Sequence, residues 1–215
     1  PDAKKMIASY AAKPVEIPRP TKDTEKINGI VKEVIYDNIQ LPAIFMGYKF
    51  PEQRHPDSYA LSMMNEVLSG GSSSRINKTI VEKKEMATFA FSFNYGLEDA
   101  GVGIFAAIAA NGIELDAIQA EFDAQIDLMK KEMISQEEFE KVRNKIENDF
   151  VSSNASIAGV AENLADNHVY YGSADRVNKE MAEYMKVTRE DIQRVAQKYF
   201  TQDSRVILHY LPKEK

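Results

Sequence analysis

Leu68–Met86 has the sequence LSGGSSSRINKTIVEKKEM, in which two glycines, three serines and an arginine precede a run of helix-forming residues. Gly70 and Gly71 permit backbone angles that residues with a Cβ resist. The serines that follow can accept backbone N–H bonds at a helix N-terminus. We therefore predict a tight turn, with a positive φ at Gly71, followed by a helix over about residues 73–84.

The same turn can also be interpreted as an anion site. Free N–H groups at a helix start, with Arg75 beside them, are able to hold a phosphate or a carboxylate. However, the segment lacks the spacing of both the Gly-x-x-x-x-Gly-Lys-Ser/Thr and the Gly-x-Gly-x-x-Gly motifs. The turn chemistry by itself therefore favours a helix cap over a phosphate site.

Residues in and just after this stretch form a longer motif, made of Leu68, Gly70, Gly71, Ser73, Ser74, Arg75, Ile76, Glu82, Lys83, Met86 and Ala87. The motif resembles the glycine–serine–arginine helix segment of the pitrilysin/insulinase family of zinc metallopeptidases, which includes the mitochondrial processing peptidases. The order of elements around it is similar over residues 22–212. The similarity is to the second of the two related domains that these proteins contain.

In that family the first domain carries the zinc motif His-x-x-Glu-His, and the second, usually metal-free, closes over the substrate. The resemblance implies that this chain is a non-catalytic C-terminal domain, with no cofactor of its own. It implies a zinc-bearing homologous domain or subunit as partner and a peptide as the substrate that is hydrolysed. The alternative is a metal-free scaffold or peptide-binding subunit without protease activity, as in the family's core subunits of respiratory complexes.

Two positions depart from the pattern of active members, whose second domain supplies an arginine and, seven residues later, a tyrosine. Here Val81 and Thr88 occupy these places. Valine cannot donate a fork of hydrogen bonds, and threonine is too short to replace a phenol. Tyr95 is a nearby phenol that could substitute. The resemblance thus implies a substrate-chamber or structural motif, without catalytic residues or metal ligands, at Gly70, Gly71, Ser74, Arg75, Val81, Thr88 and Tyr95.

Strand patterns surround this motif on both sides. Ile30–Tyr36 and Leu41–Phe50 are rich in β-branched and aromatic residues and predict two adjacent strands. Ala87–Tyr95 and Ala100–Ala110 predict a second pair, although the small residues of the latter also suit a helix. Arg205–Leu211 predicts a closing strand.

Apolar residues at spacings of three and four predict the helices. One contains Leu61, Met64 and Val67, and a second presents Leu115, Ile118, Phe122, Ile126 and Met129. Capping-box patterns at Ser135–Glu138 and Thr188–Asp191 predict two further helix starts. Helices are also expected over residues 160–171 and 175–185, with a break at residues 152–159. This order predicts an α+β, two-layer sandwich with helices packed on one face of a mostly antiparallel sheet.

The N-terminal segment differs in composition from the rest. Asp2–Tyr10 can form a short amphipathic helix, and Lys13–Thr21, KPVEIPRPT, contains three prolines that enforce extended backbone. We expect residues 1–21 to be the tail of a preceding domain with a proline-rich linker. Residues 22–215 are expected to form the C-terminal peptidase-like domain.

Composition excludes several classes of protein. The 215 residues are 44% hydrophobic and 28% charged, which is typical of one globular domain. The net charge of −6 is spread along the chain and offers nucleic acid no basic stripe. No apolar run is long enough to span a bilayer. The absence of cysteine rules out disulfides and thiol nucleophiles, and is consistent with an extracytoplasmic bacterial protein without requiring one.

A search for chemistry among the remaining residues is mostly negative. His55, His168 and His209 are too far apart in sequence for the paired histidines of a helical zinc site. We expect His168 to be a half-buried, hydrogen-bonded histidine, and the other two to be structural. The serines near residue 73 lack a Gly-x-Ser-x-Gly elbow.

Other conspicuous side chains have ordinary structural interpretations. Carboxylate pairs such as Glu137 with Glu138, or Asp123 with Asp127, are expected on solvated helix faces. The tyrosine pair Tyr170 and Tyr171 is expected in the core, as is the aromatic row of the third strand, Phe89, Phe91, Phe93 and Tyr95.

Overall fold

The computed structural model describes residues 4–6, 18, 21, 29–201 and 204–213. Five strands form one sheet in the order β1-β5-β2-β4-β3. The strands are β1 (Gly29–Asp37), β2 (Ala43–Phe50), β3 (Ala87–Gly96), β4 (Gly101–Ala109) and β5 (Ser204–Pro212). Only the β1–β5 pair among them is parallel. The predicted mostly antiparallel α+β sandwich is confirmed.

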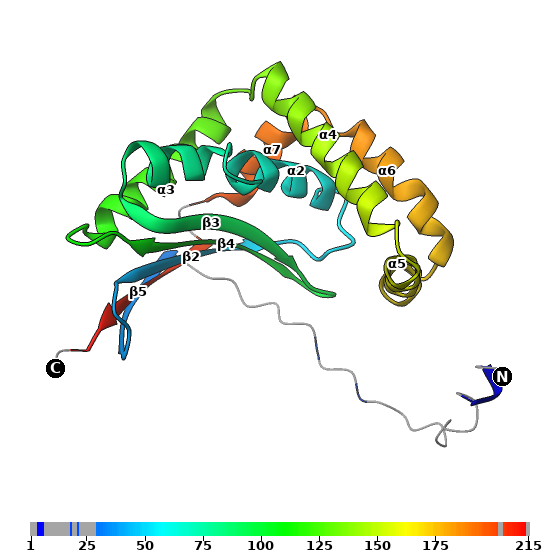
Figure 1. The fold of residues 1–215 in the computed structure, drawn as a ribbon, viewed down its shortest axis with the longest axis horizontal. Helices are drawn as coiled ribbons and strands as arrows, with labels where there is room; N and C mark the ends of the chain where they lie inside the picture. The colour runs from blue at the N-terminus through cyan, green and yellow to red at the C-terminus, as the bar shows by residue number, and fades with distance from the viewer. Residues whose placement is uncertain (1–3, 7–17, 19–20, 22–28, 202–203, 214–215) are drawn as a thin grey trace.

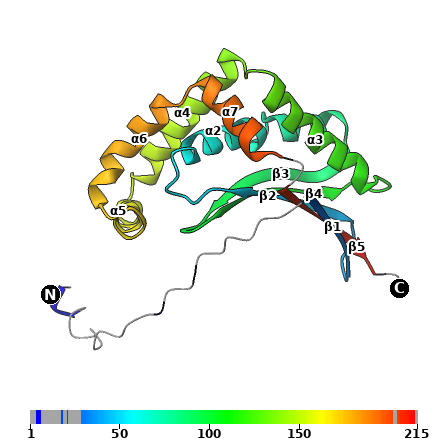
Figure 2. The same cartoon turned by 180° about the vertical axis from the view of Figure 1, so that it is seen from behind.

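Helices cover one face of this sheet, as Figures 1 and 2 show from opposite sides. They are α2 (Ser58–Ser69), the π-helical η1 (Asn77–Lys83), α3 (Leu115–Lys131), α4 (Gln136–Ser153), α5 (Ile157–Tyr171), the 3-10 segment η2 (Ala174–Arg176), α6 (Val177–Lys186) and α7 (Arg189–Tyr199). Helix α5 is seen nearly end-on beside α6, beyond one end of the sheet.

The order of the strands corrects one prediction. β1 and β2 are not neighbours, because β5 from the C-terminal end of the chain lies between them. β5 pairs in parallel with β1 and antiparallel with β2. The reason is burial. β5 lies between two strands and alternates buried with partly buried residues, whereas most residues of β1 are exposed and suit an edge.

Between the sheet and the helices lies a continuous apolar core. Phe105 of β4 contacts the rings of Tyr48, Phe122 and Phe200 with centroids 5.5–5.9 Å apart. The residues predicted for the buried stripe of α3 are all buried, at exposures of 0–4%. Burying a side chain of this size stabilises a fold by roughly 1.5–3 kcal/mol, so α3 is anchored chiefly by this stripe.

Both predicted capping boxes are present. The Ser135 hydroxyl accepts a bond from the Glu138 backbone N–H at the start of α4, and Thr188 does the same with Asp191 at α7. The predicted break near residue 155 is confirmed as the junction between α4 and α5, where Ser156 caps α5. The helix after the glycine turn exists but is π-helical over most of its length.

The N-terminal predictions lie mostly outside the described residues. Residues 4–6 are helical, and of residues 7–28 the structure describes 18 and 21 alone. The domain boundary at residue 22 therefore stays a prediction. The described part of the folded domain begins with β1 at Gly29.

Candidate functional site

The glycine turn connects α2 to η1. Gly70 ends α2, and its N–H donates to the Glu66 carbonyl. Gly71 follows with φ of +117°, a conformation that only glycine adopts without strain. A Cβ at Gly70 would lie 2.4 Å from the Glu66 carbonyl oxygen. Gly70 is thus required because a Cβ there would clash with the Glu66 backbone, and Gly71 is required because of its positive φ.

Substitution of Gly71 tests this account of the turn. A Cβ at Gly71 would have no heavy atom within 4 Å, so the cost of Gly71→Val comes from φ alone. We expect a loss of about 2 kcal/mol, which lowers the melting temperature of a domain this size by roughly 4–8 °C. Gly47→Val is the control, because its Cβ would make an ordinary 3.7 Å contact in β2. Equal melting temperatures for the two variants, measured by circular dichroism, would contradict a strained turn.

Arg75 is held by an ion pair across the helical layer. Its Nε and Nη2 each donate to a carboxylate oxygen of Glu138, at 2.8 Å, in a bidentate arrangement. Hydrogen bonds from Arg75 hold the pKa of Glu138 below its usual range, against the opposing effect of burial. This pair joins the start of η1 to the capping box of α4. Because Arg75 is engaged and Ser74 is buried, the structure offers no support for an anion site here.

Val81 and Thr88 are the positions at which the resemblance leads us to expect an arginine and a tyrosine in active members. Val81 is partly buried and packs against the core. Thr88 is exposed at the edge strand β3, and its hydroxyl donates to the Ile108 carbonyl at 3.3 Å. An arginine at position 81 would have to leave the apolar packing to reach solvent.

The face of the sheet opposite the helices, here called the open face, carries the aromatic row. Phe89, Phe93 and Tyr95 are 57%, 37% and 57% exposed, so the prediction of a core position for them is wrong. Phe91 lies between its neighbours, with ring centroids 5.0 Å from Phe89 and 5.7 Å from Phe93. No helix of the described chain covers this face.

Other strands continue the open face. Phe45 of β2 and Ile108 of β4 are each 40% exposed, and Tyr210 of β5 contacts Phe45 edge to face at 6.3 Å. These three side chains, together with Ile39, Gln40, Leu41 and Ala43, border an almost wholly apolar hollow of about 650 Å³. A continuous apolar surface of this kind on a folded domain marks an interaction site.

Sequence reasoning missed the open face although β3 carried a signal. Its aromatic residues alternate with Ala90, Ser92 and Asn94, which face α2. The Ser92 hydroxyl donates to Asn65 of α2 at 2.8 Å, and Asn94 donates to the Leu61 carbonyl at 2.8 Å. Small and polar residues on the helix-facing side let α2 approach closely. The bulky side chains are therefore left on the other side.

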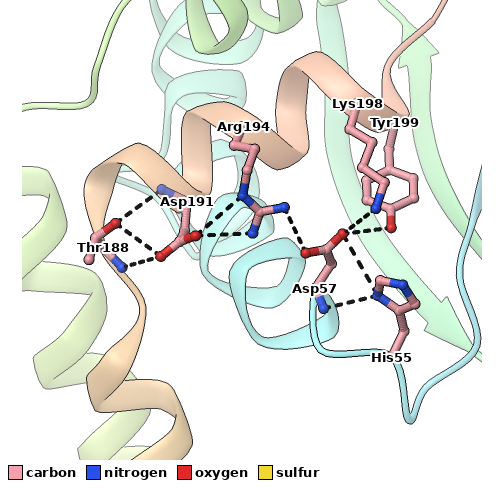
Figure 3. A network of polar contacts seen from close by, with 7 residues as sticks. All are labelled: His55, Asp57, Thr188, Asp191, Arg194, Lys198 and Tyr199. Atoms are coloured by element: carbon pink, nitrogen blue, oxygen red, sulfur yellow. Dashed lines mark hydrogen bonds and ion pairs between the residues drawn. The ribbon is translucent and has the colours of Figure 1, made fainter.

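A polar cluster joins the start of α2 to α7 (Figure 3). The buried Asp57 carboxylate accepts hydrogen bonds from Arg194, Lys198 and Tyr199 at 2.7–2.8 Å. Burial opposes ionisation, but these donors outweigh it and hold the pKa of Asp57 well below its usual range. The His55 Nδ1 accepts the Asp57 backbone N–H at 3.0 Å. This cluster orients no free nucleophile and is structural.

The histidines and carboxylates do not assemble into a metal centre. No group of three or more His, Cys, Asp or Glu side chains within the described ranges could hold a metal ion, so these residues do not fit a zinc site. His168 is exposed, which corrects the prediction that it is half-buried. His209 is buried beside Asp116, and burial lowers its pKa.

Two further predictions need correction. Tyr170 is 40% exposed, and Tyr171 stacks under the Arg176 guanidinium, 3.6 Å from its ring centroid, so the pair is not a core feature. Asp123 is not a solvated helix carboxylate, because it pairs with the buried Arg205 of β5. No helix of the described residues is long and apolar enough to cross a membrane.

Comparison with known proteins places the chain in a family. A family profile described as the Peptidase M16 inactive domain matches residues 2–146. The zinc protease PqqE of Helicobacter pylori is 31% identical over 195 residues, which cover 89% of this chain and 44% of that protein. The crystal structure of a protease from Helicobacter pylori is 28% identical with a TM-score of 0.87, over 94% of this chain and 49% of that one.

A more distant structure shares the fold alone. The periplasmic protease PqqL from Escherichia coli is 14% identical with a TM-score of 0.74, and covers 98% of this chain and 24% of its own. The chain spans about half the length of the curated relatives that it matches first. The matched profile covers more than half of the chain, and the motif at Gly70–Ala87 agrees with it. The chain therefore belongs to the M16 family of zinc peptidases, the pitrilysin/insulinase family, as a non-catalytic C-terminal domain.

Proposed function

We propose that this chain encloses a peptide substrate against a zinc-bearing M16 domain, which hydrolyses the peptide bond. The observation that carries the proposal is the uncovered open face, with its row of exposed aromatic side chains on β3. A soluble domain rarely leaves a large apolar surface in water without a partner. The relatives' additional length, which the chain does not span, supports a second domain as that partner.

The chain's contribution is shape and exclusion of water. Zinc on the partner would lower the pKa of a bound water and polarise the scissile carbonyl. The residues of this chain would hold the peptide in an apolar, water-poor space, where electrostatic interactions are stronger. Val81 and Thr88 supply no hydrogen bond to the substrate. This domain therefore acts by binding rather than by direct stabilisation of the transition state.

We also propose an extracytoplasmic bacterial location. The absence of cysteine and the shared fold with a periplasmic protease support this assignment. The partner would be a zinc-bearing domain of the same chain or a separate subunit.

The proposal is tested by assembly of this chain with a zinc-bearing M16 domain that carries the His-x-x-Glu-His motif. Cleavage of a quenched fluorescent peptide by that zinc domain is expected to fall at least about tenfold when this chain is omitted, because the peptide is then less well positioned. The double change Phe89→Ser with Phe93→Ser should reproduce much of the loss.

Ile157→Ser is the matched control for the aromatic variants. Ile157 is 92% exposed on α5, away from the open face, so this change should leave cleavage unaltered. Equal cleavage by the zinc domain with and without this chain would contradict the enclosing role. The chain would then be the metal-free scaffold that the family also contains.

A further inference from the structure

A second hollow lies between the helical layer and one end of the sheet, and Tyr95 of the open face contributes to its lining. It has a volume of about 170 Å³ and lies between the start of α2, the end of β3 and helices α5 and α6. Its walls are unusually aromatic, with contributions from Phe50, Tyr59, Tyr95, Tyr171 and Tyr184. We call it the tyrosine cavity. Among the described residues that line this cavity, Glu180 of α6 carries a carboxylate.

Glu180 has no partner of opposite charge. No ion pair or hydrogen bond joins its carboxylate to another described residue. Arg176 lies one turn earlier, but its guanidinium donates to Tyr59 and to Asn167. The same guanidinium stacks on Tyr171. Arg176 therefore fixes two aromatic walls from outside the cavity lining and forms no ion pair with Glu180.

Tyr59, Tyr171 and Tyr184 stay neutral beside this carboxylate. Burial raises the pKa of Tyr59 to about 12, and Glu180 adds to that rise against the effect of Arg176. Burial also raises the pKa of Tyr171 and Tyr184. The cavity thus combines neutral aromatic walls with one carboxylate. Aromatic rings attract cations as well as apolar chains, and the attraction grows when water is excluded.

The tyrosine cavity continues into a larger groove of about 490 Å³ along α4, since Ser62, Asn94, Glu180 and Tyr184 line both. The other carboxylates of the groove, Glu66 and Asp149, both pair with Lys145, at 3.2 Å and 2.6 Å. Glu180 at the junction is therefore the free acceptor for a positive charge. The groove beside it gives room for an extended backbone.

We propose that the tyrosine cavity binds a cationic group at the end of an alkyl chain, the ammonium of a lysine or the guanidinium of an arginine in an extended peptide. The charge would meet Glu180 and the alkyl stem would lie against the tyrosine rings, as long basic side chains do on apolar surfaces. The adjoining groove would hold the flanking peptide. This proposal concerns the chain alone and does not depend on a zinc-bearing partner or on cleavage.

Titration of the 215-residue chain with short capped peptides tests the proposal. The peptide acetyl-Ala-Ala-Lys-Ala-Ala-amide should bind at least about tenfold more tightly than the same peptide with norleucine, a difference of about 1.4 kcal/mol. Glu180→Gln should remove this preference. Binding is measured by calorimetry and by amide shifts of α6 residues, and it should weaken at higher salt.

Glu183→Gln is the matched control. Glu183 lies on the same helix, its side chain is 42% exposed and it pairs with Lys186, so its removal deletes a charge outside the cavity. It should leave the lysine preference unchanged, and thermal melts verify that both variants fold. Butylammonium chloride distinguishes a free amine from a peptide side chain as the bound cation. If this salt binds and the peptides do not, the cation site is supported and its ligand is a free amine. Equal affinity for the lysine and norleucine peptides, or an unchanged preference in Glu180→Gln, would overturn the proposal.

Discussion

Replacement of Asp123 by alanine is expected to lower the free energy of unfolding by about 3 kcal/mol, because it leaves a buried guanidinium without its carboxylate. The Arg205 side chain is 6% exposed on β5, and its Nη1 donates to Asp123 of α3 and to the Tyr48 hydroxyl. Asp123 is one-third exposed, so the expected loss is at the lower end of the range for buried pairs. Urea unfolding followed by circular dichroism measures it.

Asp127→Ala is the matched control on the same helix. Asp127 is about half exposed and pairs with Lys131 one turn away, and such surface pairs contribute only about 0.3–0.5 kcal/mol. A second variant separates charge from packing. Adding Arg205→Leu to Asp123→Ala removes the stranded charge and should restore part of the lost stability. If Asp123→Ala and Asp127→Ala unfold at the same urea concentration, the buried pair does not stabilise this fold.

Replacement of Asp57 by alanine is also expected to cost about 3 kcal/mol, since three donors at the α2–α7 contact lose their acceptor. The Asp57 side chain is 8% exposed, whereas Arg194 and Lys198 are half exposed and can return to water. The expected loss in the free energy of unfolding is therefore smaller than the summed contributions of three charged hydrogen bonds. Asp149→Ala, which removes an exposed carboxylate on α4, should have little effect.

The stability lost in Asp57→Ala should also depend on pH. The pKa of Asp57 is lowered in the folded protein, so its contribution is fully present above the ordinary aspartate pKa, near pH 4. As pH falls below that value, the unfolded state binds the proton first and the contribution is lost. The stability difference between wild type and Asp57→Ala should therefore be constant from pH 5 to pH 7 and shrink below about pH 4. A difference that is the same at pH 3 and pH 7 would contradict the role of the carboxylate.

The helices were largely determined by local sequence. The stripe from Leu115 to Met129 and the boxes at Ser135 and Thr188 specify where the helices lie and which side is buried. These signals act over one or two turns, where neighbouring residues along the chain are also neighbours in space. The positive φ at Gly71 follows from the same local chemistry. The family resemblance added the non-catalytic role, because the motif at Gly70–Ala87 was present without a zinc motif.

Sequence also predicted the existence of every strand, but not their order or their exposed side. The segment that became β5 pairs with residues more than 150 positions earlier, and no local pattern specifies such a partner. For the aromatic row of β3, alternation shows that Phe89 and Phe93 share a face. Which face the helices cover depends on the small residues Ala90 and Ser92, and on the close approach of α2 to them.

The polar sites were decided by tertiary structure alone. Asp57 meets Arg194 and Lys198 across more than 130 residues, and Asp123 meets Arg205 across 82. Glu180 becomes a candidate cation-binding residue because Tyr59 of α2 and Tyr171 of α5, which are remote in sequence, line the same cavity. Sequence by itself determined the local elements and the family, because propensity and periodicity are short-range properties. Tertiary structure decided which charges are paired, which one is left free and which apolar face stays uncovered, because these depend on distances between elements that are far apart along the chain.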